Sequence, residues 1–124
     1  MRSEASQNLI LLTYKGKVLL MHERVDPTDK ANIAWTFIAE SKDKSESHEK
    51  SLSRKVEKEI GVKIEDIKFI SDSCYYARLT DSNVNQIVRT DGKLLDFFSP
   101  KELGKILLSY PTEEFITRHR SLIQ

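Results

Sequence analysis

A polar segment that leads into a charged helix constrains this chain more than any other feature. Residues 41–45 are all small or charged, so they are expected to form an exposed loop. Ser47 suits the N-cap of a helix, and Glu49 falls in the first turn, where the helix dipole favours negative charge. Gly61 suits the left-handed backbone conformation that follows many helix ends. The sequence therefore predicts a helix from about residue 48 to residue 60.

This helix has one apolar stripe among charged residues. The stripe repeats every four residues and is expected to be buried: Leu52, Val56 and Ile60. Lys58 and Glu59 follow Lys55 by three and four positions. The three side chains are therefore predicted to project together, roughly opposite the apolar stripe. Two interpretations are open at this point, a solvated face without a role and a charged site.

Arg54 belongs to a column of like charge on the same helix. Lys50 precedes it by four residues and Lys58 follows it by four, which is mildly unfavourable for a free surface helix. Either acidic groups elsewhere or a bound anion is expected to neutralise the column. Glu46, at the base of the preceding loop, is the candidate partner of Arg54.

Short apolar runs rich in β-forming residues predict strands on both sides of the helix. The expected strands cover residues 9–14, 18–21, 35–38, 64–70 continuing into 73–79 as one long or bent region, and 93–98. Lys15-Gly16-Lys17 and Asp91-Gly92 are the expected hairpin turns, and residues 81–83 are expected to form a turn. In the third strand, Trp35 and Phe37 should share a face.

Two shorter helices are expected near the end of the chain. Ser99 and Pro100 should begin the first, whose apolar side would carry Leu103, Ile106 and Leu107. Tyr110-Pro111 should end it, and Thr112 should cap the last helix. Strands and helices follow one another without regular alternation, which predicts an α+β fold, an α/β/α sandwich with helices against a mixed sheet.

Length and composition narrow the function classes. The 124 residues are expected to form a single domain, 1–124, with residues 1–7 frayed. A net charge of +1 argues against strong nucleic-acid or membrane-surface binding, and no apolar run approaches the roughly 20 residues that span a bilayer. Cys74 is the single cysteine and is expected to be a buried thiol in a strand. The first residues lack the apolar core of a signal peptide, so a cytoplasmic location is expected.

Six residues of the central segment match a known signature in register: Glu46, Arg54, Val56, Glu59, Gly61 and Val62. The chain thus resembles the Nudix (MutT-like) hydrolases, whose signature is G-x5-E-x7-R-E-U-x-E-E-x-G-U with U aliphatic. Arg24 after the second strand, the Trp35-Thr36-Phe37 strand and residues 93–103 fit the family's flanks, so the resemblance extends roughly from Asn8 to His119. It implies a Nudix-type α/β/α sandwich and hydrolysis of a nucleoside diphosphate linked to a group X. Glu46, Arg54 and Gly61 would be structural residues of this box.

The departures from the signature concern the site itself. Ala39-Glu40 replaces the family's pair of glycines, and Ser45 replaces another common loop glycine, which implies less room for a ligand. Lys55 and Lys58 occupy two of three positions where the family has glutamates that hold divalent metal and include a candidate base. The three positions carry about −3 in the family and about +1 here.

These departures predict that Mg²⁺, the cofactor that the family implies, binds weakly or not at all. A protonated lysine has no lone pair to offer, and Mg²⁺ prefers oxygen ligands. Any remaining metal would be held by Glu59 and, as a match to a later family ligand, Asp91. Glu59, Lys55 and Lys58 are the candidate catalytic positions, although a lysine acting as base would need a lowered pKa.

Three functions remain open on the sequence. The first expectation is a protein whose metal-dependent hydrolysis is lost or strongly reduced, and which binds a nucleoside diphosphate-type ligand through Arg24, Arg54, Lys55 and Lys58. The alternatives are an active Mg²⁺-dependent pyrophosphohydrolase with altered metal ligands and a non-catalytic scaffold for protein interactions. The pattern of surface residues does not decide between a monomer and a dimer.

Overall fold

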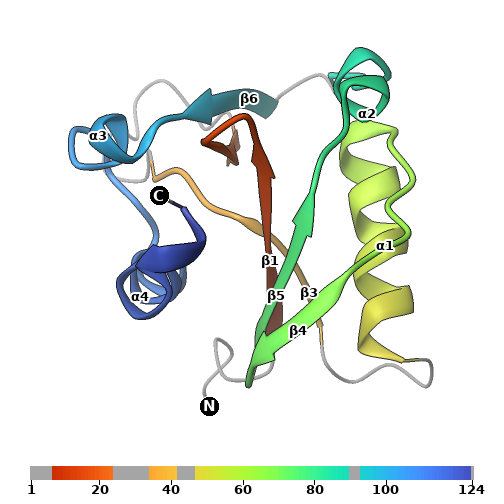
Figure 1. Ribbon diagram of the computed structural model, residues 1–124, viewed down its shortest axis with the longest axis horizontal. Helices are drawn as coiled ribbons and strands as arrows, with labels where there is room; N and C mark the ends of the chain where they lie inside the picture. Colours follow the sequence, from red (N-terminus) through yellow and green to blue (C-terminus); the bar gives the residue numbers. More distant parts are fainter. Residues whose placement is uncertain (1–6, 24–33, 42–46, 90–92, 124) are drawn as a thin grey trace.

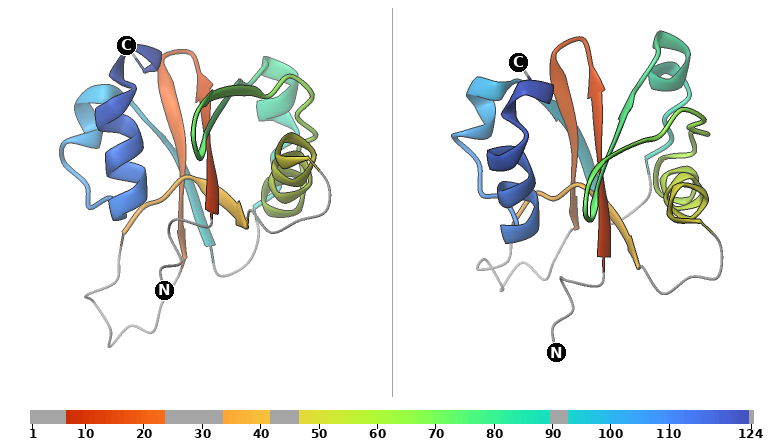
Figure 2. Two further views of the ribbon diagram at one scale, coloured as in Figure 1. Left: turned by 90° about the horizontal axis from the view of Figure 1, so that it is seen from below. Right: turned by 60° about the horizontal axis from the view of Figure 1, so that its bottom comes forward.

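A mixed β-sheet of six strands is the framework of the fold, with helices against both of its faces (Figures 1 and 2). The computed structural model describes residues 7–23, 34–41, 47–89 and 93–123. The strands are β1 (Gln7–Tyr14), β2 (Lys17–Glu23), β3 (Ile38–Ser41), β4 (Lys68–Ser71), β5 (Cys74–Arg78) and β6 (Lys93–Phe98). Their order is β4-β5-β1-β2-β6, and β3 also pairs with β1. β1 and β5 run parallel, whereas the other pairs are antiparallel.

Helix α1 (His48–Ile60) lies on one side of the sheet, while α3 (Pro100–Leu103) and α4 (Tyr110–Arg118) lie on the other (Figure 2). Helix α2 (Asp81–Asn85) is on the α1 side, and the short 3-10 helix η2 (Arg120–Leu122) follows α4. This arrangement confirms the predicted α+β fold, an α/β/α sandwich. No helix in the described part of the chain is long and apolar enough to cross a membrane.

The unbroken apolar run of β1 follows from the burial of both sheet faces. Ile10 and Leu12 point toward α1, where they pack with Leu52 and Val56 of the helix stripe. Leu9 and Leu11 point the other way and pack with the residues of α4, Phe115 among them. Alternate side chains of β1 therefore pack into two separate hydrophobic cores, one on each face of the sheet.

Helix α1 has the predicted bounds because its sequence supplies both ends. The Ser47 side chain accepts a hydrogen bond from the backbone N–H of Lys50. Gly61 adopts φ 75° and its N–H donates to the carbonyl of Glu57, which ends the helix. A Cβ atom on Gly61 would lie 3.2 Å from Cγ2 of Val88, so the position is restricted by space as well as by backbone conformation.

The Gly61→Ala variant is expected to lose about 1–2 kcal/mol of unfolding free energy, because an L-residue is strained in the left-handed region. Urea unfolding of the variant measures this loss. Gly104→Ala is the matched control: Gly104 caps α3 at φ −75°, and its added Cβ would meet only Lys101 O, at 3.8 Å. Equal losses in the two variants would contradict the prediction.

The third and fourth strands differ from the prediction. Residues 35–38 were expected as a strand, but β3 begins only at Ile38, and Trp35 and Thr36 form isolated bridges to Leu108 and Met21. The expected single strand over 64–70 and 73–79 is two antiparallel strands, β4 and β5, joined through Ser73 at φ 70°. Non-local pairing decides both outcomes, and a strand pattern alone does not show where the chain reverses.

The C-terminal helices also begin and end differently. Residues 81–83 are part of helix α2 rather than a turn, because Thr80 and Asn83 form a capping box. Helix α3 stops at Leu103, so Ile106 and Leu107 lie beyond it. These two positions therefore do not extend the apolar side that the sequence assigned to that helix.

Thr112 is buried inside α4 and does not cap it. The helix already begins at Tyr110, since a proline is tolerated in the first turn, where its missing N–H has no partner to lose. The Thr112 hydroxyl accepts hydrogen bonds from the backbone N–H of Phe37 at 3.0 Å and from Oγ of Ser109 at 2.9 Å. It thereby fastens α4 to the segment that leads into β3.

Candidate functional site

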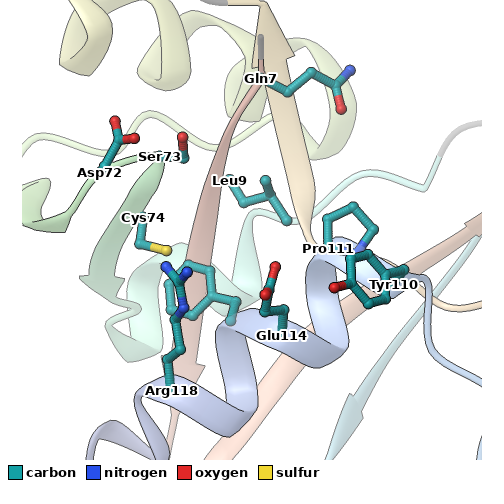
Figure 3. A pocket seen from close by; sticks show the side chains of 10 residues that line it. Gln7, Leu9, Asp72, Ser73, Cys74, Tyr110, Pro111, Glu114 and Arg118 are labelled. Atoms are coloured by element: carbon teal, nitrogen blue, oxygen red, sulfur yellow. The ribbon is translucent and has the colours of Figure 1, made fainter. Parts of the chain in front are cut away.

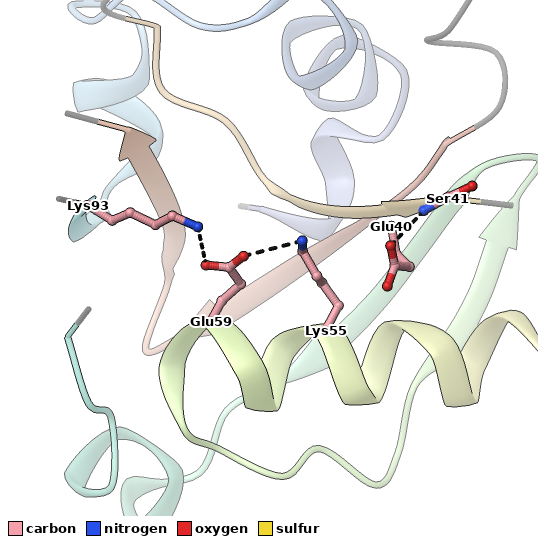
Figure 4. Close-up of polar contacts among 5 residues, drawn as sticks. All are labelled: Glu40, Ser41, Lys55, Glu59 and Lys93. Atoms are coloured by element: carbon pink, nitrogen blue, oxygen red, sulfur yellow. Dashed lines mark hydrogen bonds and ion pairs between the residues drawn. The ribbon is translucent and has the colours of Figure 1, made fainter. Parts of the chain in front are cut away.

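Glu59 lies in the last turn of α1 and is only 6% exposed, although it is charged. Its two carboxylate oxygens face ammonium groups from two different elements (Figure 4). Nζ of Lys55, one helical turn earlier, lies 3.3 Å from Oε2, and Nζ of Lys93, at the start of β6, lies 2.7 Å from Oε1. The arrangement is a buried carboxylate held between two lysines.

Opposing effects set the protonation of Glu59. Burial raises the pKa of its carboxyl, whereas the hydrogen bonds and positive charges of Lys93 and Lys55 lower that pKa, and the net shift is downward. Glu59 is therefore an anion at neutral pH. Together with its two lysines it forms a group with a net charge of about +1.

This group does not fit a divalent metal ion. Mg²⁺ requires several oxygen ligands in octahedral geometry, and here each oxygen of Glu59 already contacts an ammonium. Within the described ranges no three His, Cys, Asp or Glu side chains gather closely enough to hold a metal ion. A metal at Glu59 would also face two positive charges at short range.

The structure brings together only some of the residues that the sequence singled out. Lys55 and Glu59 project together and are in contact, but they face the sheet with the buried stripe, whereas they were expected opposite to it. Lys58 is exposed and makes no ion pair with any residue that the structure describes. Arg54 is exposed as well. Arg24, Glu46 and Asp91 lie outside the described residues, so their roles stay predictions.

Lys93 is the site residue that the sequence did not reveal. It was expected only as the first residue of the closing strand, and 34 positions separate it from Glu59. Pairing between β2 and β6 places Lys93 opposite Glu23, at one end of the sheet. A lysine that begins a strand after Asp91-Gly92 carries no local signal of a partner on α1.

Glu40 occupies the place of a glycine in the signature. Oε1 of its side chain accepts a hydrogen bond from the backbone N–H of Ser41 at 2.9 Å. From β3 the side chain points toward α1, on the side where Lys55 lies (Figure 4). A side chain thus stands where the signature has a glycine.

A cavity lies on the other face of the sheet, between the start of β1, β5 and α4 (Figure 3). Its volume is about 430 Å³, and charges of both signs line it, from Asp72, Glu114 and Arg118. Cys74 is buried at its wall, in β5 as predicted, and burial raises the pKa of its thiol. The thiol is therefore neutral and a poor nucleophile at neutral pH.

Comparison with known proteins decides the family. The NUDIX domain family matches residues 3–119, which is most of the chain. The chain belongs to the Nudix family. No curated protein matches it. Helix α1 carries the part of the matched signature from Arg54 to Glu59.

Solved structures agree with this assignment at the level of the fold. The Nudix hydrolase RenU from M. smegmatis has a TM-score of 0.69 at 14% identity, over 98% of this chain and 88% of that one. The MutT NUDIX hydrolase from Burkholderia pseudomallei has a TM-score of 0.66 at 17% identity, over 91% and 95%. The NUDIX domain of Shewanella oneidensis NrtR, in complex with ADP ribose, has a TM-score of 0.65 at 16% identity, over 95% and 87%. Identities this low show a shared fold and no more.

Proposed function

We propose that this Nudix-family chain binds a nucleotide-like diphosphate ligand without hydrolysing it, with lysine ammoniums in place of the metal as the positive partner. The observation that carries the proposal is the contact of Lys55 and Lys93 with the two oxygens of Glu59. In the family that carboxylate is a metal ligand. Here its oxygens are engaged by side chains of the protein.

Loss of hydrolysis follows from the chemistry of these side chains. Metal-dependent cleavage of a diphosphate needs a cation that neutralises developing charge and a base or metal-bound water that attacks. Glu59 is paired with two ammoniums, and the two other signature carboxylates are replaced by Lys55 and Lys58. A protonated lysine supplies charge but neither a metal ligand nor a base.

A diphosphate remains a suitable ligand because the site keeps positive charge. Lys55 carries three N–H donors, and Glu59 is its one side-chain partner in the described part of the chain. Its side chain is 27% exposed, so the ammonium is within reach of solvent and of phosphate oxygens. Arg54 and Lys58 add positive charge on the exposed side of α1. The ADP ribose bound by the NrtR domain shows that this fold accepts such a ligand in another protein.

The proposal is tested with ADP ribose and a panel of nucleoside diphosphate derivatives. Product release is measured with Mg²⁺ or Mn²⁺, and binding is measured by calorimetry at low salt in EDTA. We expect binding that does not depend on metal, and no turnover. Appreciable metal-dependent turnover by the native protein would overturn the proposal. Absence of any binding would also overturn it and would leave a protein-interaction scaffold.

A further inference from the structure

Two adjoining hollows lie on the sheet face that is opposite α1. One has a volume of about 240 Å³ and the other about 250 Å³. Tyr76 and Arg78 of β5 line both. Tyr76 packs with the core cluster of the α4 side, which places the hollows away from Lys55, Glu59 and the rest of α1.

Strand register explains why cations gather there. Lys68 of β4 is the cross-strand neighbour of Tyr76, and Arg78 follows Tyr76 by two residues, so the three side chains share one face. Thr13 of β1 pairs with Arg78 on the inner side of β5. Lys68 lines the first hollow, and Thr13 lines the second together with Lys15.

The charge balance in these hollows is positive. Lys68 and Arg78 are exposed, and neither forms an ion pair with a carboxylate among the residues that the structure describes. Lys15 has a partner, since its Nζ lies 3.8 Å from Oδ1 of Asp81. Among the described residues, Asp66 is the one acidic residue that lines the hollows, and it forms no ion pair with Lys68 or Arg78.

The Tyr76 hydroxyl, which is hydrogen-bonded to Thr13, belongs to the same strand face as Lys68 and Arg78. Oγ1 of Thr13, a residue that is 7% exposed, is 3.2 Å from the Tyr76 hydroxyl. Burial raises the pKa of Tyr76, whereas hydrogen bonds with Thr13 and Arg78 and the charges of Arg78 and Lys68 lower it. The lowering effects are together the larger, so the net shift of the pKa is downward. The surroundings of this oxygen therefore favour negative charge.

We propose that Lys68, Tyr76 and Arg78 bind a phosphate group of a small ligand, at a second site that is separate from Glu59. A guanidinium can donate two parallel hydrogen bonds to phosphate oxygens, and a lysine ammonium adds a point charge. The Tyr76 hydroxyl can donate a further hydrogen bond to a phosphate oxygen. The shared chemistry is a phosphate dianion, whether free or carried as a monoester. This site does not depend on the function proposed for α1.

The test is a two-dimensional ¹⁵N NMR titration of the full chain with inorganic phosphate, at constant ionic strength against sodium chloride. We expect saturable shifts at the amides of Thr13, Tyr76 and Arg78. Loss of one charge-assisted hydrogen bond in Arg78→Gln is expected to weaken binding about tenfold. Lys101→Gln, which removes an exposed lysine of α3 outside both hollows, is the matched control and should bind as the native chain does.

Further titrations distinguish a phosphate monoester from free phosphate, and this site from the α1 site. Glycerol phosphate that shifts the same amides with similar affinity identifies a monoester ligand, whereas phosphate alone identifies the free anion. The variant Lys55→Met/Lys93→Met should keep these shifts, which distinguishes this site from the α1 site. Shifts that sodium chloride reproduces, equal weakening in Lys101→Gln, undiminished binding in Arg78→Gln, or a response to oligonucleotides alone would each overturn the proposal.

Discussion

The free energy of unfolding of the Glu59→Gln variant is expected to be about 3 kcal/mol lower than that of the native protein. Removing one partner of a buried ion pair costs about 3–5 kcal/mol, because the remaining charge stays buried without compensation. The lower end of this energy range is expected, because the side chains of Lys55 and Lys93 are 27% and 25% exposed and their ammonium groups can be partly hydrated. Urea unfolding monitored by circular dichroism measures the difference.

Two further variants make this prediction specific. Glu57→Gln changes an exposed glutamate two residues away on the same helix and should cost less than about 0.5 kcal/mol. Replacing Lys55, Glu59 and Lys93 together by Met removes all three charges at similar volume, and the result should be close to native stability or above it. If Glu59→Gln costs no more than Glu57→Gln, the three charges do not form the buried group that the distances indicate.

The stability that Glu59 contributes should also depend on pH. Its pKa in the folded state is lowered from the ordinary value of 4.5. The contribution is therefore fully present above that value and is lost as the pH falls through the lower pKa of the folded state. The stability difference between the native chain and Glu59→Gln should accordingly shrink below about pH 4.5. A difference that stays constant through this acid range would contradict the assigned pKa direction.

Local signals made the bounds and the apolar stripe of α1 predictable. Ser47, Gly61 and the stripe of Leu52, Val56 and Ile60 act within the helix or next to it, so their effect does not depend on the rest of the fold. The signature made the family predictable, because six of its residues match in spacing even though two of its carboxylate positions are lysines here. The mixed sheet with helices on both faces followed from these two kinds of information.

Contacts between distant segments were not predictable in the same way. Lys93 joins Glu59 only because β6 pairs with β2 at the end of the sheet nearest the last turn of α1. The start of β3 is set by bridges from Trp35 and Thr36 to Leu108 and Met21, which no alternation pattern encodes. The start of α4 was misplaced because a proline can either end a helix or open one.

The triple variant Lys55→Glu/Lys58→Glu/Lys93→Gln is expected to bind Mg²⁺ more tightly than the native chain does. It restores the two signature carboxylates and removes the ammonium that would still cover Oε1 of Glu59. The three signature positions then carry about −3 in place of about +1. At a metal concentration of about one hundred times the Kd, binding stabilises the folded state by roughly 2.7 kcal/mol. Thermal unfolding with and without MgCl₂ measures this gain.

The order of effects among related variants shows which lysine excludes the metal. Lys55→Glu/Lys58→Glu alone should respond less than the triple variant, because Lys93 still lies 2.7 Å from Glu59. Lys101→Glu/Lys105→Glu changes the net charge by as much as Lys55→Glu/Lys58→Glu does, at exposed positions in and after α3, and it should show no Mg²⁺-dependent stabilisation. An equal response in that control would mean that the gain reflects net charge and not the site. Hydrolysis is not expected to return with the metal, since Glu40 still stands at the glycine position beside α1.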